Sequence, residues 1–217
     1  MPEKFISFSD RFTCEDRKGG MVVAKIYIAF VDTPGFFANI LHRVLKQKYI
    51  HVVLAFDRCL EEAYSFGRRN PALPLFSGME KENLEEIFRA FPTAEYQICE
   101  IDCAAEQKEA LFRQVRRDYA RRFYYHYAVL SLFFVWQQKP FYQRNHFTCS
   151  SYLAKVLKNV QICDFGKHFS IVTPKDFYEW KDKKIVFEGR LSELIMENRQ
   201  NKNNWNGRGT VKPAYEW

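Results

Sequence analysis

Residues 145–158 read Asn-His-Phe-Thr-Cys-Ser-Ser-Tyr-Leu-Ala-Lys-Val-Leu-Lys, and the interpretation of the whole chain depends on this stretch. Thr148 is a good helix N-cap, and the apolar residues that follow at helical spacing, Leu153, Val156 and Leu157, predict a helix packed on a core. Cys149 then falls in the first turn, where unpaired N–H groups and the helix dipole stabilise an anion. This cysteine is either a buried, inert thiol or a nucleophile, and the choice depends on whether a base reaches it.

The composition predicts one soluble, globular domain. The chain has 217 residues, of which 47% are hydrophobic and 27% are charged, enough for a sizeable core and a wet surface. We expect residues 1–20 to be a leader, residues 21–198 to form the domain, and the polar residues 199–217 to be a disordered tail. The first residues lack the basic start and apolar run of a secretory signal, so we expect a cytoplasmic protein with reduced thiols.

Cysteine spacing and charge distribution narrow the classes of ligand. None of the six cysteines belongs to a C-x-x-C pair or has a histidine at zinc-finger spacing, so we expect no metal site and no cofactor. The net charge of +7 is spread over scattered basic pairs, and we therefore expect no nucleic-acid partner. The apolar residues 123–136 are too few to span a bilayer and predict a buried helix or loop-helix.

Hydrophobic patterns place strands mainly in the first half of the chain. Apolar, β-branched residues predict strands over 21–31, 49–56, 62–66 and 96–101, with a helix over 36–46 between the first two. Helical periodicity and capping signals predict helices over 80–88, 104–122, 174–180 and 191–198, and a last strand lies at 185–187. Mixed helices and strands in this order indicate an α+β fold.

His51 is the polar exception on the strand over 49–56. Burial among apolar neighbours requires that its imidazole be hydrogen-bonded in the core or face a site. The sequence allows two registers for the hairpin that follows: one places Glu62 opposite His51, and the other places Phe66 there. Only in the first register can Glu62 orient the imidazole.

Four short segments occur in an order that resembles a known family. They are residues 49–54 (YIHVVL), 62–67 (EAYSFG), 147–153 (FTCSSYL) and 172–177 (VTPKDF). Together they resemble the circularly permuted branch of the NlpC-type peptidase superfamily, the YiiX/YaeF-like proteins. The resemblance covers about residues 22–190 and implies a circularly permuted papain-like fold, with an antiparallel sheet packed against the helix that carries the cysteine.

The resemblance implies a role for each residue of the predicted site. Cys149 takes the nucleophile position, His51 the base position and Glu62 the orienting position. Tyr64 shares the strand face of Glu62, and Gln143 lies six residues before Cys149, the spacing of the oxyanion-hole glutamine in ordinary papain-like enzymes. We list both as substrate-binding candidates. Val53, where many members have a small residue, is expected to narrow the cleft.

The expected activity is that of a cysteine peptidase or amidase, which would cleave an amide bond in a small peptide or amino-acid conjugate through an acyl-thioester. Two alternatives stay open at this point. One is a thiol-dependent acyltransferase acting on lipid, for which residues 123–136 would contact an acyl chain or a membrane. The other is a binding domain of the same fold without turnover. Membrane contact is not favoured by the sequence, and the oligomeric state cannot be derived from it.

Overall fold

The computed structural model describes residues 16–18, 21–34, 48–68, 77–128, 131, 134–135 and 137–208. The strands, in chain order, are β1 (Asp16–Lys18), β2 (Met21–Asp32), β3 (His51–Ala55), β4 (Ala63–Arg68), β5 (Ser77–Lys81), β6 (Glu95–Ala104), β7 (His126–Tyr127), β8 (His146–Phe147) and β9 (Lys184–Arg190). The helices are α2 (Leu84–Ala90), α3 (Ala105–Ala120), α5 (Cys149–Asn159), α6 (Pro174–Glu179) and α7 (Leu191–Arg208), with short 3₁₀ turns η2 (Arg122–Tyr124) and η3 (Phe169–Ile171). The helix predicted over 36–46 lies outside the described residues.

A seven-stranded antiparallel sheet organises the chain, in the order β5-β4-β3-β2-β6-β9 with β1 paired to β2. The long strand β2 is central and pairs with β3 on one side and β6 on the other. A separate two-stranded parallel pair joins β7 to β8. The predicted α+β class and antiparallel sheet are confirmed.

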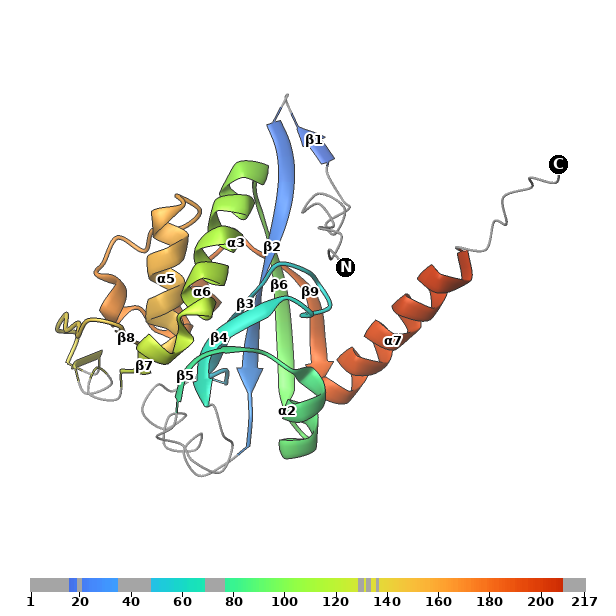
Figure 1. Cartoon of the computed structure of the whole chain (residues 1–217), viewed down its shortest axis with the longest axis horizontal. Helices are drawn as coiled ribbons and strands as arrows, with labels where there is room; N and C mark the ends of the chain where they lie inside the picture. The colour runs from blue at the N-terminus through green and yellow to red at the C-terminus, as the bar shows by residue number, and fades with distance from the viewer. Residues whose placement is uncertain are drawn as a thin grey trace, which may run out of the picture.

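Helices cover both faces of the sheet (Figure 1). On one face α3, α5 and α6 pack over a core that includes Phe66, Leu111 and Leu157. On the other face α2 and α7 pack over a second core that includes Val53 and Leu194. Because β2 and β3 are covered on both sides, their side chains are mostly apolar, which explains why the sequence shows them as apolar runs.

Three predicted segments differ from the structure. Residues 16–18 belong to a strand, so the expected leader joins the sheet through pairing with β2. The expected tail continues α7 to Arg208, and its helical turns are held by salt bridges from Arg199 to Glu85 at 2.8 Å and from Lys202 to Glu61 at 2.7 Å. The helix predicted over 80–88 begins only at Leu84, after the Asn83 N-cap, and β5 precedes it.

The apolar segment 123–136 is the fourth correction. It opens with the 3₁₀ turn η2 and strand β7, and Phe123 and Tyr124 are 67% and 70% exposed. The expected burial is therefore wrong for its first two residues. Among the described residues no helix is long and apolar enough to cross a bilayer.

Candidate active site

The start of α5 holds Cys149 in place through a complete capping arrangement. The Thr148 hydroxyl accepts the backbone N–H of Ser151 at 3.1 Å, and the Ser151 hydroxyl accepts the Thr148 N–H at 2.8 Å. The neighbouring Ser150 donates to the carbonyl of Val172 at 2.7 Å, which ties this turn to the segment before α6. The predicted helix and its cap are confirmed, and the position of the sulfur is set by local hydrogen bonds.

The structure brings Cys149 and His51 together although 97 residues separate them in the chain. The His51 imidazole, at the start of β3, lies close enough to the Cys149 thiol for each group to shift the pKa of the other. Helix α5 packs its apolar face on β3 and β4, so its first turn reaches the end of the sheet where β3 begins. His51 is 26% exposed, whereas Cys149 is buried in the core cluster at 6% exposure.

The two groups shift each other's titration in opposite directions. Burial alone raises the pKa of Cys149, but the charge and hydrogen bond of His51, and backbone N–H groups, outweigh it and lower the pKa. Burial lowers the pKa of His51, but the charge and hydrogen bond of Cys149 and the interaction with Glu82 outweigh it and raise the pKa to about 10. The interaction therefore favours transfer of the Cys149 proton to the imidazole.

Two backbone N–H groups help to lower the pKa of the Cys149 thiol. They belong to Val52, next to the histidine on β3, and to Ser150, in the first turn of α5. Val52 lies nearer the start of β3 than the two residues that pair with β4, which are Leu54 (paired with Tyr64) and Ala55 (paired with Ala63). A pair of fixed N–H donors beside a thiolate is suited to stabilising negative charge there, whether on the sulfur or on an adjacent oxyanion.

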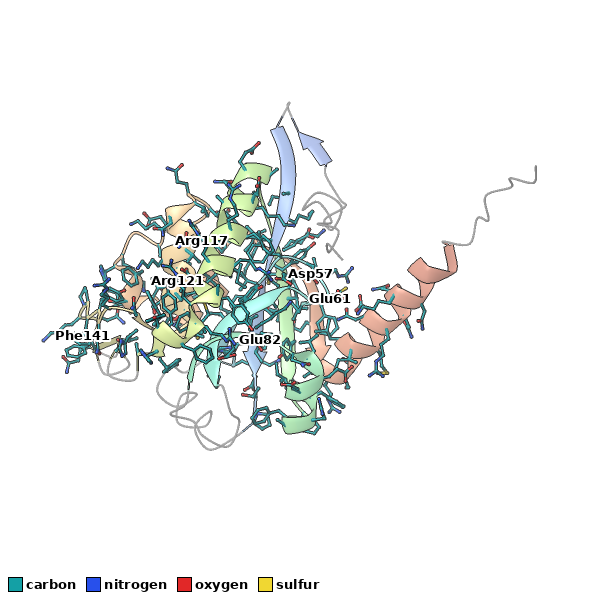
Figure 2. The ribbon with its side chains drawn as sticks, viewed as in Figure 1. Asp57, Glu61, Glu82, Arg117, Arg121 and Phe141 are labelled. Carbon is teal, nitrogen blue, oxygen red and sulfur yellow. The ribbon has the colours of Figure 1, made fainter. Side chains whose placement is uncertain are left out.

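Glu82 is the carboxylate that faces the imidazole. Its Oε1 lies 3.8 Å from His51 Nε2, an ion-pair separation longer than an ordinary hydrogen bond. The buried Ser65 hydroxyl donates to the same carboxylate oxygen and holds it from the β4 side. Glu82, labelled in Figure 2, follows β5 directly. Its N–H continues the β4–β5 ladder by donating to the carbonyl of Ala63 at 2.9 Å.

Gly67 makes room for this arrangement. A Cβ at that position would lie 3.2 Å from the Ser65 hydroxyl oxygen and 3.7 Å from Cε1 of His51. The β3–β4 register, continued by the same step from the Leu54–Tyr64 pair, places Gly67 opposite His51. Both registers derived from the sequence, with Glu62 or Phe66 in that place, are therefore wrong.

The predicted orienting role of Glu62 is not supported by its position. Its carboxylate binds Lys81 at 2.6 Å and Arg116 at 3.1 Å, and it accepts the Tyr64 hydroxyl. Burial raises the pKa of Glu62, but the Lys81 and Tyr64 hydrogen bonds outweigh it and the pKa is lowered. The reason is the turn that precedes β4: Asp57 accepts the N–H groups of Glu61 and Glu62, which lengthens the loop and shifts the register.

The two substrate-binding candidates also lie elsewhere. Tyr64 is 2% exposed, packs against Phe56 and Tyr119, and bonds Glu62, so its side chain is part of the core. Gln143 is exposed in a turn whose carbonyl accepts the His146 N–H at 3.0 Å, and a substrate contact from it stays a prediction. Val53 is buried in the second core, on the α7 side, and does not narrow a cleft at the cysteine.

Sequence reasoning missed Glu82 because it missed β5. The residues of β5, Ser-Gly-Met-Glu-Lys, contain a glycine and two charges and lack strand propensity, yet they form a sheet edge against β4. The available signal was the Asn83 N-cap, which accepts from the N–H groups of Glu85 and Glu86 and ends the preceding segment at Glu82.

Cys149 differs from the other described cysteines in the direction of its pKa shift, because only Cys149 has a pKa that is lowered. Burial raises the pKa of Cys59, and it raises the pKa of Cys99, Cys103 and Cys163 to about 11.

Among the described residues, no group of three or more His, Cys, Asp or Glu side chains is placed to hold a metal ion. Protein-family models, curated proteins and solved structures were compared with the chain, and none matches it.

Proposed function

We propose that the protein is a cysteine hydrolase that cleaves an amide bond in a peptide or amino-acid conjugate. The observation that carries this proposal is the interacting Cys149–His51 pair at the capped start of α5, with the sulfur pKa lowered and the imidazole pKa raised. A structural cysteine has no need for a charged partner, and the other described cysteines have raised pKa values.

The reaction follows from the positions of these groups. The Cys149 thiolate attacks the carbonyl carbon of the amide, and the N–H groups of Val52 and Ser150 stabilise the oxyanion that forms. The His51 imidazolium protonates the leaving amine as the C–N bond breaks, which leaves an acyl-thioester. His51 then removes a proton from water, whose oxygen attacks the thioester, and the carboxylic acid and thiolate are released with His51 again protonated.

Glu82 acts as a positioning residue in this scheme. It does not touch the substrate, but its carboxylate lies 3.8 Å from His51 Nε2, stabilises the imidazolium and sets the direction of the ring. Ser65 holds Glu82 in turn. Glu82 thus takes the place that the sequence assigned to Glu62.

The order of elements supports the circularly permuted papain-like fold as part of the proposal. In this chain the strand that carries the histidine, β3, precedes the helix that carries the cysteine, α5, which is the permuted order. A reducing compartment such as the cytoplasm would keep the thiol available for catalysis.

Active-site labelling tests the proposal. One portion of full-length protein is treated with a fluorescent iodoacetamide, and a separate, unlabelled portion is treated with mixtures of acylated peptides, with acyl-enzyme formation on Cys149 followed by mass spectrometry. We expect His51→Ala to lower turnover by at least about a hundredfold, while the melting temperature changes little. Glu62→Gln is the matched control for Glu82→Gln, because both remove one carboxylate and only Glu82 faces His51. Loss of stability without loss of labelling in His51→Ala would refute the proposal.

A further inference from the structure

The net positive charge of the chain is concentrated in one segment. Residues 113–144 contain seven Arg or Lys and one Asp, a formal charge of +6 against +7 for the whole chain. The single acid, Asp118, accepts the hydroxyl groups of Tyr125 and Tyr152 at 2.9 Å each. The Asp118 carboxylate is thus engaged by two tyrosines, and none of the described arginines of this segment forms a salt bridge with it.

Several of these basic side chains lack the salt bridges that basic residues form elsewhere. In the described part of the chain, Arg117, Arg121 and Arg144 are exposed and none of them pairs with a carboxylate. By contrast, Lys81, Lys167 and Arg199, which lie outside this segment of the sequence, each bind a carboxylate within 3 Å. Unpaired cations on an exposed surface are available for an external anion.

Large aromatic side chains adjoin the unpaired cations. Phe123 and Tyr124 are 67% and 70% exposed on the turn η2, immediately after Arg121, and Tyr142 is 38% exposed. The parallel β7–β8 pair, with His126 opposite His146, brings η2 beside the turn that carries Tyr142 and Arg144. Figure 2 shows Arg117 and Arg121 along α3 and Phe141 farther out on the same side of the view, the side opposite α7.

We propose that this basic aromatic patch, made of Arg117, Arg121, Phe123, Tyr124, Tyr142 and Arg144, docks the protein on an anionic lipid surface. Basic side chains bind the headgroups, and exposed aromatic rings beside them enter the interfacial layer. Because β8 leads directly into α5, docking holds the edge of the Cys149 site next to the membrane.

The cation–aromatic contacts favour lipid over nucleic acid as the occupant. Arg122 lies over the Phe123 ring at 4.5 Å, and Lys155 lies over the Tyr142 ring at 5.2 Å. Nucleic-acid bases stack on open ring faces, and the cation over each of these two rings leaves only one face for such stacking. Insertion of ring edges beside cations among headgroups requires no such open face.

Vesicle co-sedimentation of the full-length protein tests the proposal. We expect binding to vesicles of phosphatidylcholine with about one-third phosphatidylglycerol, weak binding to phosphatidylcholine alone, and release as salt shortens the screening length from about 10 Å toward about 3 Å. Arg117→Gln with Arg121→Gln should weaken binding about thirtyfold, since each basic residue near an anionic surface contributes about a factor of five. Phe123→Ser with Tyr124→Ser should weaken it further by removing the inserted rings.

Two matched pairs control for charge and apolar area. Lys181→Gln with Arg190→Gln removes two exposed cations elsewhere, and Ile185→Ser with Met196→Ser removes two exposed apolar side chains that lie outside the patch. We expect both pairs, and Cys149→Ala, to bind as the unchanged protein does, so the result is independent of the hydrolase proposal. Equal loss in patch and control variants, or no binding to anionic vesicles at low salt, overturns the inference. Binding to a single-stranded oligonucleotide that the patch variants abolish, without vesicle binding, also overturns it.

Discussion

Glu82→Gln should lower the pKa of His51 while leaving the fold intact. The glutamine keeps an oxygen that can accept the Ser65 hydroxyl, so the variant removes the charge and preserves the shape. At the 3.8 Å separation of Glu82 Oε1 and His51 Nε2, two unit charges interact by about 1 kcal/mol in bulk water and about 4 kcal/mol at an effective dielectric constant near 20. Because one pKa unit corresponds to about 1.4 kcal/mol, the expected fall is about one to three units.

Nuclear magnetic resonance titration of ring-labelled histidine measures this shift. The chain has five histidines, so a His51→Gln sample assigns the resonance by its absence. In the unchanged protein the imidazole should stay protonated through neutral pH and lose its proton near pH 10, because its pKa is raised to about 10. In Glu82→Gln the transition should move toward neutral pH, and hydrolysis should fall about ten- to a hundredfold.

Glu62→Gln supplies the control, since that carboxylate binds Lys81 and Arg116. It should leave the His51 transition within a few tenths of a unit, whereas Cys149→Ser should lower it, because the charge of Cys149 raises the pKa of His51. An unchanged titration in Glu82→Gln, or an equal shift in Glu62→Gln, would refute the assignment of Glu82.

Four further outcomes are expected. Brief iodoacetamide treatment at neutral pH should modify Cys149 before the other described cysteines, as mass-spectrometric mapping would reveal, because only its pKa is lowered; faster modification elsewhere contradicts this. Gly67→Ala should reduce turnover more than it reduces the melting temperature, since the added Cβ would press on the Ser65 hydroxyl 3.2 Å away; a variant as active as the parent would count against this. Leu194→Ala should cost about 2–5 kcal/mol in urea unfolding, because this side chain of α7 is 2% exposed and packs in the second core. Asp176→Asn should destabilise the protein by about 1 kcal/mol above pH 4 and have a diminishing effect below it. Burial raises the pKa of Asp176, but hydrogen bonds from Lys167 and Thr173 outweigh burial and lower the pKa overall. The stabilisation by the Asp176 carboxylate is therefore complete above the unfolded pKa of 3.8 and is lost as the pH falls through the folded pKa.

The local elements that position the nucleophile follow from the sequence. Helix α5 is predicted by Thr148 and by the apolar positions over the three turns that follow it. These signals can be read from the sequence because N-capping and helical periodicity act between residues about four positions apart. The apolar strands β2 and β3 follow for the same reason. His51 was identifiable as a residue in need of a partner, because an imidazole among apolar neighbours is costly without one.

The third member of the site was decided by tertiary structure. The β3–β4 register depends on how the Asp57 carboxylate folds the connecting turn, and Leu60 adopts a φ of 59° within it, a conformation that residue preferences do not predict. A register change of one residue turns every side chain of a strand to the other face of the sheet. The observed register differs by five residues, an odd number, from the one that would place Glu62 opposite His51, so the Glu62 carboxylate binds Lys81 and Arg116 instead.

The local sequence pattern therefore determines which residues begin a helix or form a strand. Which group lies beside a buried charge is determined by the register in which the strands pair. The sequence by itself determined a thiol at a helix start and a histidine on an apolar strand. Only the tertiary structure placed Glu82 and Ser65 beside that histidine, because β5 forms a strand through pairing with β4 and not through its own composition.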